Sequence, residues 1–219
     1  EDVRRYAEKY IKDIPRGTPQ PVETREPKQL GEKRFVMKDP SQPLFGAGYH
    51  IGKVRHPDWS VYEVIAGVLG QGRTSRLYTK LVKQDNLAVQ AMAFAGFPGQ
   101  KYETGLLVLG IPVKGKTAAD MEAAIDAEVE RLVTEGITEQ ELAAVKQRAR
   151  AEFVRSLQGN GGMAEQLAFY QTMFGDWRRL FDAVARIEAV TLEDVKRVAA
   201  GVFQESNRTV AIIETEKDS

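Results

Sequence analysis

The hydrophobic pattern of the chain changes its period within residues 103–132, ETGLLVLGIPVKGKTAADMEAAIDAEVERL. Residues 103–113 are rich in Leu, Val and Ile and follow a Pro-Gly-Gln turn signal, which predicts a strand. From Thr117 onward the apolar residues fall on one face of a helix: Met121, Ile125, Val129 and Leu132. Thr117 and Asp120 fit a capping box, in which a hydroxyl and a carboxylate satisfy the first N–H groups of a helix. This stretch therefore predicts a strand that leads directly into a helix.

Upstream of this stretch the pattern is mostly that of strands. Strands are expected over 33–38, 43–52 and 87–97, and the last of these forms a hairpin with 103–113. Gly46 and Gly48 inside the second strand suggest either a close backbone approach or a bulge. One helix is expected over 59–69, capped by Asp58, and a short one over 75–83.

Downstream the chain is almost entirely helical in pattern. A second apolar stripe runs from Leu142 to Phe153, further helical patterns fill 163–203, and residues 208–214 form a closing strand. Thr138 with Glu141, and Thr191 with Asp194, repeat the capping-box pattern. Strands followed by a block of helices favour an α+β fold, a two-layer sandwich of a largely antiparallel sheet covered on one face by helices.

The start of the chain differs from the rest. Val3, Tyr6, Ala7 and Tyr10 recur at helical spacing, and Pro15 to Pro27 contains four prolines, which is typical of a linker. We expect residues 1–29 to be the end of a preceding domain plus a linker, and residues 30–219 to be the domain itself. The chain opens inside a helical pattern without an initiating Met, so we expect a fragment of a longer protein.

Composition excludes several classes of function. Lys plus Arg and Asp plus Glu are equal at 31 each, so no overall charge favours nucleic acid or an acidic membrane. The absence of cysteine excludes disulfides, thiolate catalysis and cysteine-bound zinc, and it does not indicate a compartment. No apolar run approaches the roughly 20 residues that span a bilayer.

The segment from Gly110 to Thr117 matches the phosphate-binding-loop pattern between a strand and a helix. A phosphate cradle needs successive backbone N–H groups, and Pro112 has none. The predicted fold also lacks the alternating parallel strands of nucleotide-binding domains. A strand end followed by a helix cap is therefore favoured, and a nucleotide-binding module is kept as a remote alternative.

Two histidines, His50 and His56, are the only ones in the chain, and neither has an acidic residue at a helical ligand spacing. Since a catalytic zinc takes about three protein ligands, the sequence predicts no metal site in this chain. It also contains no Gly-x-Ser-x-Gly motif for a nucleophilic serine.

A glycine turn with two arginines follows the helix at 59–69: Gly70-Gln71-Gly72-Arg73-Thr74-Ser75-Arg76-Leu77-Tyr78. Such a loop can present backbone and guanidinium donors to a peptide or anion. The competing interpretation is a helix stop and a new N-cap at Thr74 or Ser75, with solvated arginines.

Four segments together resemble a known family. They are Tyr6 to Pro15, His56-Pro57-Asp58, Gly70 to Tyr78 and Thr138-Glu139-Gln140-Glu141-Leu142. In this order they resemble the end of the catalytic domain and the landmarks of the C-terminal, non-catalytic domain of peptidase M16 proteins, the pitrilysin, insulinase and mitochondrial processing peptidase type. The resemblance covers essentially the whole chain and implies the LuxS/MPP-like metallohydrolase fold.

The resemblance implies a division of labour. In such zinc peptidases a His-x-x-Glu-His helix binds zinc in one domain and a similar domain completes the substrate chamber. His-x-x-Glu-His does not occur in this chain, so no activity and no cofactor are expected here, with zinc in the partner catalytic domain. The partner domain belongs to the same polypeptide or to another chain, or the protein is a homo-oligomer. A bacterial protein, periplasmic or cytoplasmic, is implied, and a catalytically silent scaffold is the alternative.

The sequence departs from the family at one point. Many relatives carry an Arg and a Tyr, seven residues apart, that bind the substrate backbone, and the resemblance places Val82 and Val89 there. Either Lys83 or Tyr78 substitutes, or the pair comes from a partner chain, or the protein is a structural member of the family. The candidate residues for substrate or partner binding are Gly70, Gly72, Arg73, Arg76, Tyr78 and Lys83.

Overall fold

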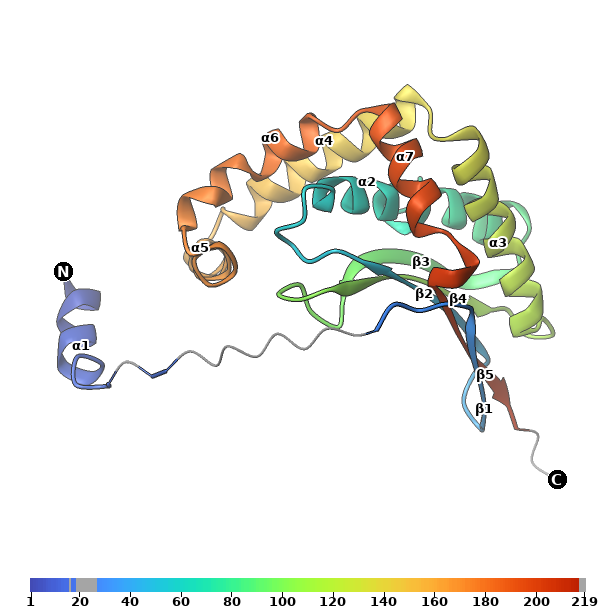
Figure 1. The fold of residues 1–219 in the computed structure, drawn as a ribbon, viewed down its shortest axis with the longest axis horizontal. Helices are drawn as coiled ribbons and strands as arrows, with labels where there is room; N and C mark the ends of the chain where they lie inside the picture. Colours follow the sequence, from blue (N-terminus) through green and yellow to red (C-terminus); the bar gives the residue numbers. More distant parts are fainter. Residues whose placement is uncertain (16, 19–26, 217–219) are drawn as a thin grey trace.

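The structure, a computed structural model, describes residues 1–15, 17–18 and 27–216. Its main feature is a sheet of five strands with a layer of helices over one face (Figure 1). The strands are β1 (Lys33–Asp39), β2 (Leu44–Ile51), β3 (Ala88–Phe97), β4 (Thr104–Pro112) and β5 (Arg208–Thr215). Their spatial order is β1-β5-β2-β4-β3, with only β1 and β5 parallel. The predicted α+β sandwich with a largely antiparallel sheet is confirmed.

The helices follow the order that the hydrophobic pattern predicts. They are α1 (Asp2–Tyr10), α2 (Trp59–Gly70), α3 (Ala118–Glu135), α4 (Glu139–Ser156), α5 (Asn160–Phe174), α6 (Ala183–Glu188) and α7 (Leu192–Val202). Short 3-10 helices lie at η2 (Trp177–Asp182) and η3 (Glu205–Asn207). The short helix expected over 75–83 is for most of its length a π-helix, η1 (Tyr78–Gln84), a rare form often found at functional sites.

The core lies between the sheet and α2, α3 and α7. Alternate residues of the strands point into it, because side chains alternate across a sheet. Phe45, Leu106, Val108 and Val210 are fully buried there. They meet Ile65 and Leu69 of α2 and Met121 and Ile125 of α3, which are also fully buried. The same alternation places the intervening residues of these strands on the face without helices.

Helix starts in this layer are fixed by local sequence. All three predicted capping boxes are present, with Thr117, Thr138 and Thr191 as N-caps and a carboxylate three residues later. Asp58 stands at the N-cap of α2 but makes no side-chain capping bond. Its carboxylate instead pairs with Arg197 of α7 at 2.7 Å, which ties the start of α2 to α7. Asp58 is therefore at the predicted N-cap position, but the predicted hydrogen bond from its side chain to the helix is wrong, because the Arg197 guanidinium competes for the carboxylate.

The two interior glycines of β2 lie in a regular ladder, so the expected bulge is wrong for this strand. A Cβ at Gly46 would lie 2.9 Å from Cδ2 of Leu109, and one at Gly48 would lie 2.9 Å from Cδ2 of Leu107. The close approach is thus made by leucine side chains of β4. The irregularities in pairing occur in β3, at Ala88/Gln90 and Ala95/Phe97.

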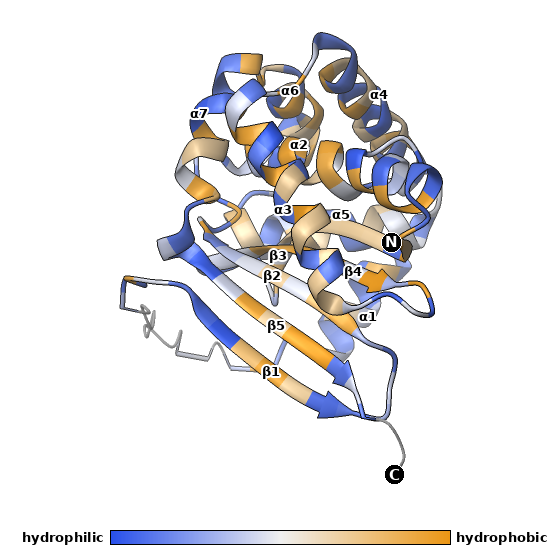
Figure 2. Ribbon diagram, turned by 90° about the vertical axis from the view of Figure 1, so that its right-hand side faces the viewer, coloured by the Kyte–Doolittle hydropathy of each residue, from blue (hydrophilic) through white to orange (hydrophobic). Residues whose placement is uncertain are grey.

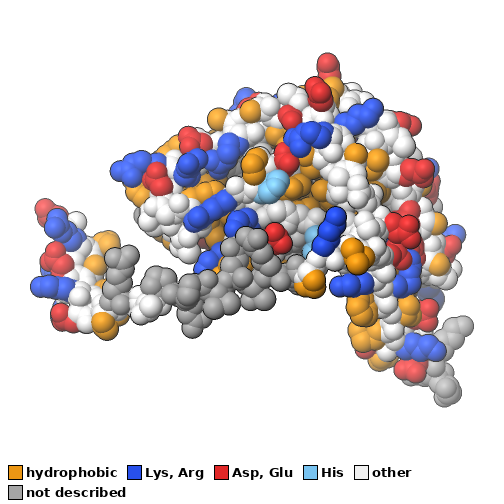
Figure 3. All heavy atoms as spheres, viewed as in Figure 1, with side chains coloured by type: hydrophobic (Ala, Val, Ile, Leu, Met, Phe, Trp, Pro, Cys, Tyr) orange, Lys and Arg blue, Asp and Glu red, His pale blue; other side chains and the backbone are white. Residues whose placement is uncertain are grey.

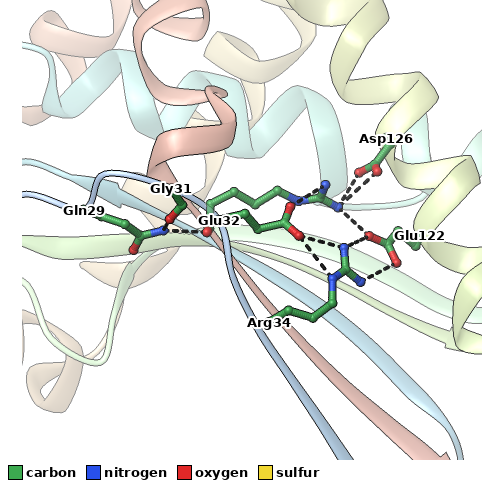
Figure 4. Close-up of polar contacts among 7 residues, drawn as sticks. Gln29, Gly31, Glu32, Arg34, Glu122 and Asp126 are labelled. Atoms are coloured by element: carbon green, nitrogen blue, oxygen red, sulfur yellow. Dashed lines mark hydrogen bonds and ion pairs between the residues drawn. The ribbon is translucent and has the colours of Figure 1, made fainter.

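An ion network joins β1 and β5 to α3 (Figure 4). Arg34 contacts Glu122 at 2.7 Å, and Arg208 contacts Asp126 at 2.8 Å and Glu32 at 3.2 Å. Gln29 donates to the carbonyl of Arg208, so contacts with the domain begin one residue before the predicted boundary at residue 30. These contacts fix the edge of the sheet that lies farthest from α2.

Helix α1 lies apart from the sheet and its helices (Figure 1). It has no buried residue, and its large apolar residues Val3, Tyr6 and Tyr10 are exposed, as is Ile11 directly after it. The proposed linker over residues 15–27 falls largely outside the described residues. The helices that the structure describes include none with the length and apolar character of a membrane span.

Candidate functional site

The predicted contact loop begins where α2 meets the sheet. Gly70 ends α2 against β3, and a Cβ there would lie 1.9 Å from the backbone nitrogen of Ala93. Gly72 has a φ of 80°, a conformation that favours glycine. Ser75 donates its hydroxyl hydrogen to the Gly72 carbonyl at 2.8 Å, so it closes the turn. Both glycines therefore serve the shape of this loop, while residues 71–74 are exposed at its tip.

The two arginines of the loop have different positions. Arg73 is exposed, as a contact residue requires. Arg76 is turned inward and donates to the Glu141 carboxylate at 2.6 and 2.9 Å and to the Gly136 carbonyl at 2.9 Å. It is therefore held by the start of α4 and is not part of the surface that the loop presents.

Tyr78 and Lys83 lie together on the π-helix. The Nζ atom of Lys83 is 5.5 Å from the centroid of the Tyr78 ring, a cation–π distance. Lys83 is exposed and Tyr78 is half-buried. The structure thus brings together the two residues predicted as substitutes for the missing substrate-binding pair.

The two valines at the positions of that pair differ in environment. Val82 is partly buried against the core, whereas Val89 is 61 % exposed at the irregular start of β3. Neither valine side chain can donate a hydrogen bond to a peptide backbone. Of the substitutes that the sequence suggests, Tyr78 and Lys83 can make a polar contact at this place.

One residue of the loop region escaped the sequence analysis. Arg148 of α4 donates to the Gln71 carbonyl and, at 3.5 Å, to the Gly67 carbonyl. It thus binds carbonyl oxygens at the end of α2, where few carbonyls find a partner within the helix, although the Gly67 carbonyl also accepts from the Gln71 amide at 3.4 Å. Nothing in the sequence distinguishes Arg148 from the other basic residues of α4, because its role depends on the crossing of α2 and α4.

The segment that matches the phosphate-loop pattern has no free cradle. Gly110, Ile111 and Pro112 belong to β4 and are paired with β3. A Cβ at Gly110 would lie 2.3 Å from Cε of Met121, so the glycine allows α3 to pack on the sheet. Thr117 is the N-cap of α3, as the competing interpretation predicts. The nucleotide-binding alternative gains no support from this geometry.

Neither histidine stands in a metal site. The Nδ1 atom of His56 accepts from the Asp58 amide at 3.1 Å. The described part of the chain contains no group of three or more His, Asp or Glu side chains that could hold a metal ion. The residues present here therefore do not fit the zinc of an M16 catalytic domain, and that zinc remains a prediction about a partner.

A second candidate surface, missed in the sequence, is the face of the sheet opposite the helices. Among the described residues no helix lies against it (Figure 1). A trough of about 450 Å³ runs across its centre, where Gly46 and Gly48 leave space between Leu107, Leu109 and Phe97. Tyr102 and Phe97 at its rim are 44 % and 52 % exposed. Exposed apolar surface of this kind is typical of interaction sites.

Solved structures with the same fold indicate the class of protein to which this domain belongs. A protease from Helicobacter pylori shares this fold with a TM-score of 0.88 at 25 % identity, over 97 % of this chain and 52 % of that chain. The peptidase M16 inactive domain from Pseudomonas fluorescens has a TM-score of 0.79 at 15 % identity, over all of this chain and 51 % of that chain. The fold is that of the domains found in such proteases.

The sequence gives the family. Residues 1–149 match the family described as the peptidase M16 inactive domain, and the chain belongs to that family. The zinc protease PqqE of Helicobacter pylori is 27 % identical over 191 residues, which are 86 % of this chain and 42 % of that protein. The chain therefore spans about half the length of these two Helicobacter pylori proteases. The resemblance inferred from the sequence motifs is confirmed.

Proposed function

We propose that this domain is the non-catalytic half of an M16-type zinc peptidase. It docks through the open face of its sheet onto a catalytic domain that bears His-x-x-Glu-His and helps to enclose a peptide substrate. The observation that carries the proposal is the apolar trough on that face, because a two-layer fold leaves such a face in water unless a further layer covers it.

Two further findings support this partner. The zinc protease PqqE and the protease from Helicobacter pylori are each about twice as long as the chain, so each contains a further part of at least comparable size. The family to which the chain belongs is described as inactive, and the chain contains no zinc motif of its own. A catalytic domain is thus the partner that we propose for the open face, because it would supply the zinc motif that this chain lacks.

The contact with substrate would come from the exposed tip of the loop and from the π-helix beside it. Arg73 and Lys83 are exposed cations that can pair with carboxylates or carbonyls of an extended peptide. Gly70, Gly72 and Arg76 hold the loop in place. Substrate binding is therefore assigned to Arg73, Tyr78 and Lys83, with the other three as positioning residues.

Docking is tested by mixing this domain with the His-x-x-Glu-His domain and measuring chelator-sensitive cleavage of an unfolded peptide. The double variant Leu107→Glu/Leu109→Glu places two carboxylates on the open face and should abolish both co-elution and cleavage. Val154→Glu, at a 55 % exposed position of α4, is the matched control and should change neither. Equal cleavage by the partner alone, or full support by the double variant, would show that the proposal is wrong.

The substrate role is tested separately on the docked pair. Arg73→Ala/Lys83→Ala should raise KM several-fold and leave co-elution unchanged, whereas Lys80→Ala, which only loses an exposed ion pair with Asp85, should change neither. One observation favours the scaffold alternative: Val82 and Val89 stand at the positions where many relatives carry the Arg and the Tyr that bind the substrate backbone. This alternative predicts normal docking with no peptide cleavage by the docked pair.

A further inference from the structure

The two edges of the sheet differ in how they are protected. The outer strand β3 has pairing irregularities near both ends, and η1 packs against it. Bulges and covering segments are common ways to prevent an edge from pairing with another strand. The opposite edge strand, β1, has neither. Its register with β5 runs without interruption from Lys33↔Thr209 to Asp39↔Thr215, and it contains no proline.

The middle of β1 is apolar and exposed. Phe35, Val36 and Met37 are 59, 55 and 58 % exposed, and they are three consecutive residues. Figure 2 shows the hydrophobic centre of β1 at the outer edge of the sheet. Figure 3 shows hydrophobic side chains at the surface where this end of the sheet projects beyond the helices. β1 carries charged residues at both ends, Lys33 and Arg34, and Lys38 and Asp39, so the template for pairing with another strand is its regular apolar centre.

The backbone of β1 shows which groups are available for such pairing. The Glu216 amide donates to the Asp39 carbonyl at 2.9 Å. Because backbone groups alternate in direction along a strand, those of residues 33, 35, 37 and 39 point to β5. The groups of Arg34, Val36 and Lys38 therefore point away from the sheet.

The sequence of β1 is complementary to itself in the antiparallel direction. With a two-fold axis through Val36, each Phe35 lies opposite Met37 of the other copy and each Lys33 lies opposite Asp39. Opposed residues share a face, so the apolar pairs and the opposite charges would lie side by side. Arg34 would lie opposite Lys38, but its guanidinium is already bound by Glu32 and Glu122 at 2.8 and 2.7 Å. Such a contact is isologous, as a two-fold dimer requires.

We propose that two copies of this chain pair through β1, antiparallel about a two-fold axis at Val36, and so join their two sheets into one continuous sheet. The outward N–H and C=O groups of Arg34, Val36 and Lys38 form the new ladder. The inference concerns the edge of the sheet and does not rest on the proposed docking through its open face.

A charge exchange tests the pairing directly. Lys33→Asp gives a chain with Asp at both ends of β1, and Asp39→Lys gives a chain with Lys at both ends. In light scattering the wild type should approach twice its 24.4 kDa with rising concentration, and each variant alone should dimerise at least about tenfold more weakly. The equimolar mixture should dimerise again, because every Asp then faces a Lys. A mixture that stays monomeric, or single variants that dimerise like the wild type, would overturn the proposal.

A cross-link gives an independent readout, because the chain has no cysteine of its own. Val36→Cys should form a disulfide between two copies under mild oxidation, since hydrogen-bonded antiparallel partners lie about 5.5 Å apart at Cα. Val154→Cys, equally exposed on α4, should remain uncrosslinked. If Val36→Cys cross-links no faster than the control, or pairs instead with an added His-x-x-Glu-His domain, the assignment to a second copy is wrong.

Discussion

The two faces of the same sheet are built from neighbouring residues and have opposite environments. On the helix side Leu106 and Val108 are fully buried, and on the other side Leu107 and Leu109 remain partly in contact with water. On the helix side the glycines let backbone and helix approach, as at Gly70 and Gly110. On the open side Gly46 and Gly48 leave a trough. The comparison shows that one face of the sheet is packed in the core, while the other carries an apolar trough that no described helix covers.

The largest expected effect comes from a glycine on the covered face. Gly70→Ala places a Cβ 1.9 Å from the backbone nitrogen of Ala93, so α2 and β3 have to separate. We expect a loss of stability above the roughly 1–3 kcal/mol typical of overpacking, measured by urea unfolding. Gly48→Ala meets only the end of the Leu107 side chain and should cost much less. Equal losses for the two variants would contradict the distinction between the faces.

Adjacent leucines of β4 give the next largest contrast. Leu106→Ala should lower the free energy of unfolding by about 2–5 kcal/mol, because it leaves a cavity in the core. Leu107→Ala, one residue along, removes a side chain from the open face and should cost less than about 1 kcal/mol. Urea unfolding of both variants measures the difference. A large loss for Leu107→Ala would mean that the open face is already part of a packed core.

The partly buried ion pair between Arg76 of the loop and Glu141 of α4 gives a smaller, pH-dependent effect on stability. Burial alone would raise the pKa of Glu141, but hydrogen bonds from Arg76 and Thr138 outweigh it and lower the pKa to about 2. A lowered carboxyl pKa stabilises the fold above the ordinary value of 4.5, and that stability is lost as the pH falls from 4.5 toward 2.

Arg76→Ala should therefore cost about 2 kcal/mol at neutral pH and flatten the loss of stability over this acid range. Urea unfolding at several pH values measures both, with Arg73→Ala as the exposed control. If Arg76→Ala kept the wild-type dependence on pH, the guanidinium would not be the partner that lowers the pKa of Glu141.

The smallest expected effect lies at a helix end within the covering layer. Thr191→Ala removes the hydroxyl that accepts from the Asp194 amide at 3.1 Å and should cost about 1 kcal/mol. Thr172→Ala, an exposed position of α5, is the control with no expected change. In thermal unfolding, Thr191→Ala should lower the melting temperature less than Leu106→Ala does. The reverse order would mean that the helix cap contributes more to stability than the packing between the layers.

Most elements could be predicted because they depend on near neighbours in the chain. The period change at Thr117 and the three capping boxes act within four residues, so sequence alone locates those helices. The prediction of a capping bond by Asp58 was wrong because the Arg197 side chain binds the carboxylate instead. Arg197 lies 139 residues away in the sequence, so local sequence could not reveal this contact. The inward turn of Arg76 depends likewise on Glu141, 65 residues along the chain.

The candidate surfaces were predictable only in part for the same reason. Motif order alone indicated the M16 family and the loop from Gly70 to Tyr78, and the family is confirmed. The trough on the open face joins residues of β2 and β4, and the position of β1 at an edge depends on which strand the sheet places outermost. Sequence determined the elements, the missing zinc motif and the family, since these lie in local patterns. Only the tertiary structure decided which residues face helices and which face solvent, because strand order and helix crossing bring together residues distant in sequence.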